Sequence, residues 1–304
     1  MRIVDRLKSA APCFSFEFFP PHTAEGVNSL FRTITELSPL QPAYVSVTYP
    51  GSSTADPDPE IRRRRELTLE LTRRIRAESG IEAMAHVTCS GHTRDELVQL
   101  LDRLAEEGAE NVLALRGDPP GGTGKFVKHQ GGFDHAVELI SLIRERGYDF
   151  CVGAACYPET HLECADPDED VRHLKAKVDA GADFLVSQLF HDNRRWREFM
   201  VRVRAAGIEV PVEPGLMPII SRDGIVRMAA LSGASLPDAL RRELDARGDD
   251  PDAVVEIGVA HTTAQSLELL DAGAPGIHFY TLNRSRATRE IVSAIRSHPG
   301  PDQT

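Results

Sequence analysis

The stretch DAGADFLVSQ, residues 179–188, leads from a helix end through Gly181 into an apolar run. The same order of signals recurs in EEGAENVLAL at 106–115 and in DAGAPGIHFY at 271–280. Glycine often ends a helix because it adopts the left-handed backbone conformation without steric cost. The short apolar run that follows predicts a strand buried on both faces, as in a parallel sheet. The repeated stretch therefore predicts helices and parallel strands in alternation.

This alternation extends outward along the whole chain. Eight strand-like runs are predicted at residues 13–19, 43–48, 83–88, 111–115, 150–156, 184–189, 210–216 and 276–280. Amphipathic helical patterns lie at 24–37, 60–79, 94–107, 133–146, 168–180, 193–206, 222–233 and 285–297, with an additional one at 252–271. Such alternation gives either a doubly wound sheet or a closed barrel. Eight units in 304 residues favour the barrel, so we predict an α/β (βα)8 TIM barrel with an extra helix before the last strand.

Length and composition are typical of one globular domain, with 41% hydrophobic and 27% charged residues. We predict a single TIM-barrel domain over residues 1–298 and a disordered tail over 299–304. Two long stretches rich in glycine and proline follow strands, at 50–59 and 119–132. In a barrel both belong to the face that carries the active site. The second lacks the GxxxxGK[ST] pattern, so it is expected to be a flexible lid or linker rather than a phosphate-binding loop.

Several classes of protein are disfavoured by the charge and the apolar pattern. The net charge of −11 argues against a nucleic-acid partner and against binding to an anionic membrane surface. No run approaches ~18 uncharged apolar residues, so no membrane span is expected. Residues 1–12 lack the apolar core of a secretory signal. The expected compartment is the cytoplasm.

The cysteines are few and their number is odd. The chain has five, namely Cys13, Cys89, Cys151, Cys156 and Cys164. An odd number without a secretory signal argues against a disulfide framework, and small buried thiols are the simplest interpretation. The alternative is a metal site built from the last three cysteines and a nearby histidine. Because the chain has no Cys-x-x-Cys pair, we expect no metal.

Polar residues cluster at the carboxyl ends of the predicted strands, which in a barrel converge on one mouth. This set comprises Glu17, Thr48, His86, Thr88, Arg116, Asp118, Tyr157, His161, Gln188, Thr281 and Arg284. It contains acids, a candidate base, amide donors and two arginines. Residue chemistry alone therefore predicts a site with an acid and cationic donors.

Glu17 stands out because it lies within FSFEFFPP, between phenylalanines. An apolar environment raises the pKa of a carboxyl group, which would let Glu17 donate a proton near neutral pH. The alternative is a structural glutamate bonded to an arginine inside the barrel.

Further charged residues follow the fourth and fifth strands. Arg116 and Asp118 lie in LALRGDPP, where two prolines restrict the loop. Arg116 could pair with a phosphate group or with a nearby carboxylate, and both remain open. Lys175 and Lys177 lie on one helical segment, although a solvent-exposed face is the alternative reading.

Eight segments occur together in a recognisable order, namely FSFEFFPP, YVSVTY, MAHVTCSGHT, NVLALRGDPP, AACYPETHLE, DEDVRHLKAKVDAGADFLVSQLF, PGLMPI and HFYTLNR. They run from about residue 14 to residue 284, and together they resemble the methylenetetrahydrofolate reductase family in its short, barrel-only form. The resemblance implies a TIM barrel that binds FAD and takes reducing equivalents from NADH or NADPH. It implies reduction of 5,10-methylenetetrahydrofolate to 5-methyltetrahydrofolate after protonation of N10, a step of one-carbon metabolism linked to methionine biosynthesis.

The resemblance also implies roles for individual residues. Glu17 matches the general acid, and Asp118 matches an aspartate near the flavin and the pterin. Gln188 and Arg284 match substrate-binding positions. The positions that match FAD-binding residues are Thr48, His86, Arg116, Gly117, Asp118, Tyr157, His161, Glu163, Asp170 and Lys177.

The sequence departs from the family pattern at several places. The segment 50–59 carries an insertion, His135 stands where a tyrosine is usual, and His191 is unusual. The region 237–248 lacks a stacking aromatic, with Leu244 or a neighbour in its place.

Two alternatives remain open for the function. The barrel could take electrons from a partner flavoprotein or ferredoxin, or it could be a non-catalytic folate-binding subunit. A homo-oligomer is expected, and control by S-adenosylmethionine through a C-terminal domain is not.

Overall fold

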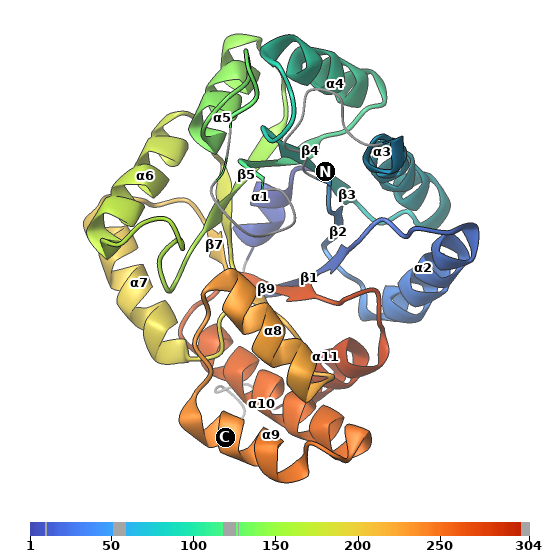
Figure 1. The fold of residues 1–304 in the computed structure, drawn as a ribbon, viewed down its shortest axis with the longest axis vertical. Coiled ribbons are helices and arrows are strands. Elements are labelled where there is room, and N and C mark those ends of the chain that lie inside the picture. Colours follow the sequence, from blue (N-terminus) through green and yellow to red (C-terminus); the bar gives the residue numbers. More distant parts are fainter. Residues whose placement is uncertain (10, 51–58, 118–125, 127, 299–304) are drawn as a thin grey trace.

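The computed structural model describes residues 1–9, 11–50, 59–117, 126 and 128–298. They form a barrel of parallel strands enclosed by helices (Figure 1), which confirms the predicted fold class. The strands are β1 (Cys13–Phe18), β2 (Tyr44–Val47), β3 (Ala83–Thr88), β4 (Asn111–Leu115), β5 (Cys151–Cys156), β6 (Phe184–Ser187), β7 (Val212–Glu213), β8 (Gly215–Leu216) and β9 (Gly276–Tyr280). Their order in the sheet is β7-β6-β5-β4-β3-β2-β1-β9-β8.

The helices surround this sheet and lie close to the predicted segments. They are α1 (Ile3–Leu7), α2 (Ala24–Leu37), the 3-10 helix η1 (Ser38–Leu40), α3 (Pro59–Ser79), α4 (Arg94–Glu106), α5 (Ala136–Glu145), α6 (Pro167–Asp179), α7 (Asn193–Ala205), α8 (Arg222–Ser232), α9 (Asp238–Arg247), α10 (Pro251–Asp271) and α11 (Arg286–Ser297). Helix α10 is the predicted extra helix before the last strand. In the described part of the chain, no helix is both long enough and apolar enough to cross a membrane.

The seventh predicted strand, at 210–216, is wrong as a single element. Its first half, β7, pairs with β6, and its second half, β8, pairs with β9. Pro214 separates the two halves, and proline cannot donate a hydrogen bond to a strand ladder. The change of partner at this residue closes the barrel, because β7 and β8 lie at opposite ends of the sheet order.

Gly215 makes this closure sterically feasible. A Cβ atom at this position would lie 2.2 Å from the backbone oxygen of Ser187 on β6 and 2.7 Å from the Tyr280 hydroxyl on β9. The Gly215 N–H also donates to Ser187 Oγ at 2.9 Å. Only a residue without a side chain lets this segment approach the β6 backbone and the Tyr280 ring so closely.

Strand β1 shows how the barrel separates two environments. Phe14, Phe16 and Phe18 pack in the main core with residues of the surrounding helices, such as Leu30 and Ile34. Successive side chains of a strand point to opposite faces. Ser15 and Glu17 therefore point into the barrel, where they contact residues of other strands.

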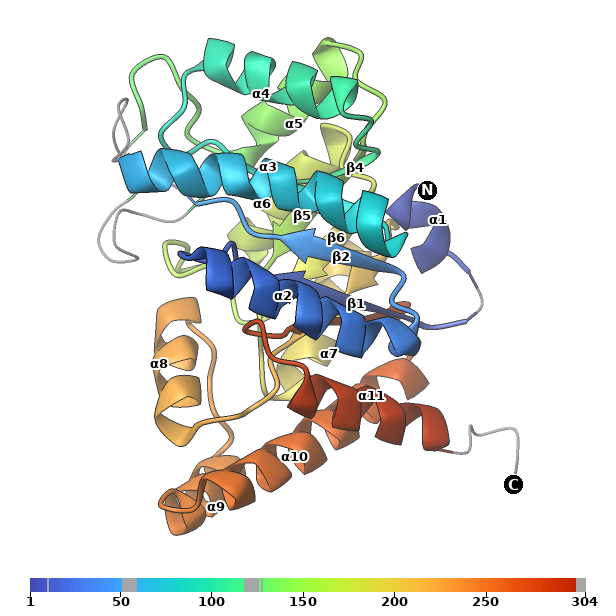
Figure 2. The same cartoon turned by 90° about the vertical axis from the view of Figure 1, so that its right-hand side faces the viewer.

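The α-helices α1 and α9 and the 3-10 helix η1 were absent from the prediction. Helix α1 buries Ile3, Val4 and Leu7 against residues inside the amino-terminal end of the barrel. Figure 2 shows α1 at the opposite end from α8 and the carboxyl ends of the strands. A segment of five residues is too short for helical periodicity to reveal. Helix α9 buries Leu240 and Leu244 against α8 and α10.

Candidate active site

The predicted strand-end residues lie on neighbouring strands of the barrel. Strands β6, β5, β4, β3, β2, β1 and β9 are consecutive in the sheet. Each carries or directly precedes one of the predicted residues, namely Gln188, Tyr157, Arg116, His86, Thr48, Glu17 and Thr281, and Arg284 follows β9 after a short turn. Because all these strands are parallel, their carboxyl ends form one continuous arc around the mouth.

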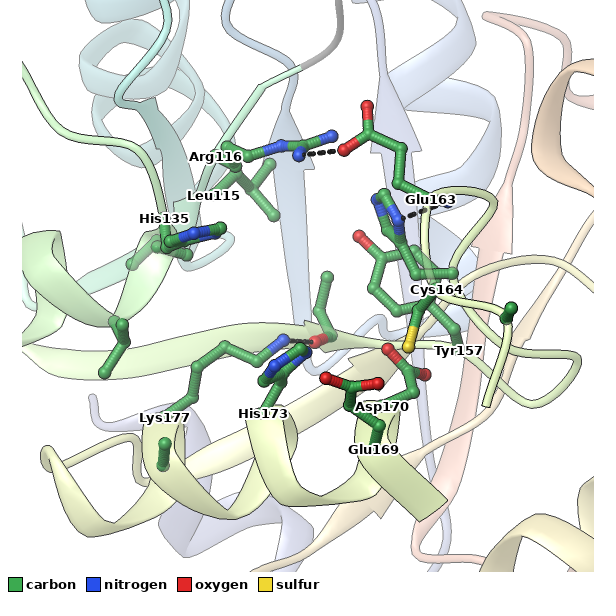
Figure 3. Close-up of a pocket in the computed structure, with 17 residues that line it drawn as sticks. Leu115, Arg116, His135, Tyr157, Glu163, Cys164, Glu169, Asp170, His173 and Lys177 are labelled. Atoms are coloured by element: carbon green, nitrogen blue, oxygen red, sulfur yellow. Dashed lines mark hydrogen bonds and ion pairs between the residues drawn. The ribbon is translucent and has the colours of Figure 1, made fainter. Parts of the chain in front are cut away.

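A cavity of about 360 Å³ opens on this arc, between the ends of β4 and β5 and helices α5 and α6. Its volume is within the range of small-molecule sites. Six residues that the sequence assigned to the cofactor line it, as Figure 3 shows: Arg116, Tyr157, His161, Glu163, Asp170 and Lys177. Leu115, Ala155 and Ala176 add apolar surface.

Arg116 enters the cavity directly after β4. Its Nη1 lies 2.5 Å from Glu163 Oε2, a carboxylate 47 residues away in the sequence. The local bridge to Asp118 that the sequence left open falls outside the described residues. This guanidinium lowers the pKa of Glu163. The next residue, Gly117, has φ +89°, and a Cβ atom there would lie 2.7 Å from Ser90 Cβ. Glycine is therefore required where the chain leaves β4 beside the cavity.

Lys177 and Asp170 come from helix α6 and face the cavity from below in Figure 3. Lys177 Nζ donates to the Ala155 carbonyl at 2.5 Å and lies 5.8 Å from the centre of the Tyr157 ring. Burial lowers the pKa of Lys177, whereas Asp170 nearby raises it. Burial in turn raises the pKa of Asp170, against the effect of Lys177. By contrast, Lys175 pairs with Asp179 on the outside of the same helix.

The Tyr157 and His161 rings meet edge to face, with their centroids 4.7 Å apart. Burial and the adjacent Arg116 lower the pKa of His161. The cavity thus combines two cations, Arg116 and Lys177, with an aromatic ring and the carboxylates of Glu163, Glu169 and Asp170. Such a set offers donors for an anionic group and acceptors for hydroxyl groups.

One group of side chains with metal-binding atoms occurs among the described residues. Atoms of Cys164, Asp170 and His173 lie within 4.8 Å of one another at the edge of the cavity. Cys151 and Cys156, which the sequence alternative combined with Cys164, are buried in strand β5 and do not belong to this group.

Glu17 lies inside the barrel mouth and is only 6% exposed. Its Oε2 accepts a hydrogen bond from Ser46 Oγ at 3.4 Å and lies 3.5 Å from His278 Nε2. His86 Nε2 is 3.3 Å away and has no hydrogen-bond partner within the described chain. Burial alone raises the pKa of Glu17, but the two imidazoles outweigh burial and lower this pKa to about 2.

The prediction of an apolar environment that raises the pKa of Glu17 is therefore wrong. Its phenylalanine neighbours in sequence lie on the other face of β1, against the helices. The side chains that surround it come from β2, β3 and β9, and they are polar. The alternative of an arginine partner is not supported either, since two histidines hold the carboxylate. The alternation of side chains along a strand was the signal that could have revealed this.

The remaining predicted residues are placed as follows. Thr48 follows β2, and its carbonyl accepts from Thr68 Oγ1 at 2.8 Å. Gln188 Oε1 accepts from the Leu189 N–H at 2.9 Å, and the Arg284 side chain is exposed. Asp118 lies outside the described residues, as do most of the stretches 50–59 and 119–132 and the whole tail 299–304.

Three departures noted in the sequence have clear positions. His135 lines the cavity beside Arg116. Leu244 does not take the place of a stacking aromatic, because it is 1% exposed and packs in a cluster with Leu240 and Val254. His191 is buried, and burial together with the neighbouring His261 lowers its pKa to about 4.

Four polar residues inside the barrel were missed by sequence reasoning. These are Ser15, Tyr44, Glu213 and His278, all fully buried. They contact one another across the barrel, next to Glu17. The pattern could have revealed them as inward-facing positions of predicted strands.

The fold and the site define an α/β barrel with a small-molecule cavity at the carboxyl ends of its strands and an acidic residue in its mouth. The sequence profile of the family Methylenetetrahydrofolate reductase matches residues 2–296. The chain therefore belongs to the methylenetetrahydrofolate reductase family, as the resemblance of its motifs implied.

Curated relatives support this assignment. Methylenetetrahydrofolate reductase (NADH) 1 of Arabidopsis thaliana is 37% identical over 96% of this chain and 50% of its own length. The 5,10-methylenetetrahydrofolate reductase of Escherichia coli is 33% identical over 94% of this chain and 91% of its own length. The chain thus spans about half the length of the plant relatives it matches and most of the bacterial one.

A solved structure confirms the fold independently. An uncharacterized protein from Clostridium thermocellum that binds two copies of 5-methyl-5,6,7,8-tetrahydrofolic acid superposes with a TM-score of 0.63. The match covers 96% of both chains at 15% sequence identity. At this identity the likeness speaks for the fold alone.

Proposed function

We propose that this protein reduces 5,10-methylenetetrahydrofolate to 5-methyltetrahydrofolate, with FAD as cofactor and NADH or NADPH as reductant. The observation that carries this proposal is the cavity at the barrel mouth, which gathers Arg116, Lys177, Asp170 and Tyr157 beside the arc that holds Glu17. The names of the relatives support the reaction, and the donors of the cavity support a cofactor bound there.

The donor set of the cavity fits FAD. Arg116 and Lys177 offer cationic donors for the diphosphate, and the Asp170 carboxylate offers an acceptor for a ribose hydroxyl. We infer that Gly117 contributes by holding the turn after β4, since a Cβ atom there would lie 2.7 Å from Ser90 Cβ. We infer that His161, Glu163, Tyr157, His86 and Thr48 complete the binding site, together with Asp118.

The chain's own residues then have separate tasks. When bound, the flavin supplies the hydride that reduces the one-carbon unit. Glu17 donates a proton from Oε2 to N10 of the folate, which opens the five-membered ring. Gln188, Arg284 and Asp118 hold the folate at the mouth. The apolar walls of the cavity exclude water from the cofactor.

The decisive experiment is a visible spectrum of the purified protein, followed by anaerobic addition of NADH or NADPH. We expect a flavin spectrum that bleaches with at least one nucleotide and recovers when 5,10-methylenetetrahydrofolate is added. A protein that contains no flavin and takes none up on reconstitution would refute the proposal. If neither nucleotide bleaches a bound flavin, electrons come from a partner flavoprotein or ferredoxin instead.

Lys177→Met is expected to weaken flavin binding by about 10- to 100-fold, the effect of losing one charge-assisted hydrogen bond. Methionine keeps much of the volume of the side chain on α6 but removes its ammonium group. Titration of the apoprotein with FAD measures the dissociation constant. The matched control is Lys175→Met, two residues away on the same helix, which removes only the surface pair with Asp179. Equal affinities for the two variants would contradict the role of Lys177.

A further inference from the structure

A chain of polar groups runs through the interior of the barrel from Glu17 to a second buried carboxyl group. His278 Nε2 lies 3.5 Å from Glu17 Oε2, and His278 Nδ1 lies 2.7 Å from Ser15 Oγ. Ser15 Oγ is in turn 3.0 Å from Glu213 Oε1. Glu213 and His278 are both 0% exposed, so the inner end of this chain has no contact with solvent.

The strand register explains how these groups meet. Ser15 on β1 is level with His278 on β9 and with Tyr44 on β2. Glu17 lies two residues further along β1, on the same inward face and nearer the mouth. Glu213 ends β7, immediately before the break at Pro214, and reaches across the barrel. Tyr44 donates to Glu213 Oε2 at 2.5 Å, which leaves Oε1 to Ser15.

These contacts permit two arrangements with the same number of protons. If Glu213 is ionised, it accepts a hydrogen bond from Ser15, and Ser15 accepts one from His278 Nδ1–H. The proton is then on Glu17, which donates it to His278 Nε2. If Glu213 is protonated, it donates to Ser15 Oγ, Ser15 donates to His278 Nδ1, and His278 Nε2–H donates to an ionised Glu17. The two arrangements differ in which carboxyl group holds the proton, in the direction of the Ser15 hydroxyl and in which ring nitrogen of His278 is protonated.

We propose that Glu213 stores a proton that Ser15 and His278 relay to Glu17. The transfer moves the Glu213 proton to Ser15 Oγ, the Ser15 proton to His278 Nδ1, and the His278 Nε2 proton to Glu17 Oε2. Ser15 and His278 each gain one proton and lose one, and no electrons are transferred. Glu213 becomes a carboxylate and Glu17 a carboxylic acid, which can then protonate the substrate.

The pKa shifts of the two carboxyl groups agree with a proton that is stored on Glu213 rather than on Glu17. Burial raises the pKa of Glu213, against the effects of His278, Tyr44 and Ser15. The pKa of Glu17 is lowered to about 2 by His86 and His278, which outweigh burial. Two carboxyl groups whose environments drive their pKa values apart are suited to separate roles. The other titratable groups that face the chain are His86 on β3, Tyr44 on β2, Cys13 on β1 and Tyr280 on β9.

The catalytic part of the relay rests on the proposed function. The relay in turn explains how Glu17 can donate a proton in that function. With His86 and His278 beside it, Glu17 is ionised at neutral pH and has no proton of its own to donate. Storage at Glu213 keeps a proton in the barrel until the folate arrives. Glu213, Ser15 and His278 are positioning residues in this scheme, since Glu17 alone reaches the substrate.

Infrared spectroscopy of the whole protein tests the storage without any ligand. We expect the wild-type protein near neutral pH to show the carbonyl band of a buried protonated carboxyl group, sensitive to D2O. Glu213→Gln should lose this band, and Glu209→Gln, an exposed control four residues earlier, should keep it. Absence of the band from the wild type, or its persistence in Glu213→Gln, would overturn the proposal.

Two further variants test the connection to Glu17. Tyr44→Phe keeps the carboxyl group of Glu213 and removes its partner at Oε2, so the infrared band should remain but shift in frequency. An unchanged band counts against Glu213, even if Glu213→Gln does not fold.

Ser15→Ala interrupts the chain and should slow folate reduction by roughly 100-fold. The effect should increase as the pH rises, whereas flavin reduction by the nucleotide stays unchanged. Ser297→Ala on the exposed end of α11 is the control.

The outcomes separate the relay from the proposed function. A protein that takes up no flavin refutes the proposed function, and the infrared bands still decide the storage of the proton. If flavin and folate reactions proceed but Ser15→Ala matches the wild type at every pH, the relay is refuted and the proposed function stands.

Discussion

Glu17→Gln is expected to slow folate reduction by about 10²–10⁴-fold, the usual contribution of a general acid, while flavin reduction by the nicotinamide nucleotide continues. Glutamine has nearly the same shape and can still contact Ser46, His86 and His278. It has no transferable proton, so N10 of the folate would remain unprotonated and the ring closed. Hydride transfer from the nucleotide to the flavin needs no such proton.

Stopped-flow measurement of the two half-reactions checks this prediction, with flavin bleaching by the nucleotide followed separately from reoxidation by the folate. Glu25→Gln, on the exposed face of α2, is the matched control and should resemble the wild type. If Glu17→Gln reoxidises with folate at the wild-type rate, another group is the acid. If it also fails to bleach, Glu17 contributes to cofactor binding or to folding instead.

Gly215→Ala is expected to destabilise the protein by about 3 kcal/mol, at the upper end for overpacking. The new Cβ would lie 2.2 Å from the Ser187 backbone oxygen. A backbone atom of a strand cannot move aside as the end of a flexible side chain can. The clash lies at the junction of β7 and β8, so it weakens the contact that joins the two ends of the sheet. A loss of this size lowers the melting temperature by roughly 5–10 °C in a chain of this length.

Thermal unfolding followed by circular dichroism measures this effect. Gly224→Ala on helix α8 is the control, because its nearest contacts are Ser221 side-chain atoms at 3.2 and 3.3 Å. Alanine is also the better helix former, so the control should change the melting temperature little. A Gly215→Ala protein as stable as the wild type would show that the β7–β8 junction can shift at little cost.

The barrel could be predicted from the sequence because the features that indicate it are local. A glycine such as Gly181, at φ +115°, ends a helix, and the apolar run after it is a strand. The break at Pro214 was missed because either half of 210–216 is apolar enough to continue one strand, and only the partners on both sides reveal the exchange.

The candidate site was predictable in its members but not in its electrostatics. Parallel strand ends meet at one face, so Arg116, Tyr157 and Gln188 could be placed at the mouth without a structure. Lys177, on helix α6, was assigned to the cofactor only by the family resemblance. The environment of Glu17 depends on His86 and His278, which are distant in sequence and adjacent only once the barrel closes. The alternation of side chains could have placed Glu213 inside the barrel, but it gives no hint of its partner Ser15, 198 residues away.

Helix α1 gives the barrel a closed floor. Ile3, Val4 and Leu7 fill the end opposite the mouth, beneath the polar groups around Glu213. These three side chains are buried, so they offer the polar groups no contact with solvent at this end. In the proposed function, a folate bound at the mouth would cover the other end. Each turnover would then use the protons already inside, and they would be replaced when the product leaves.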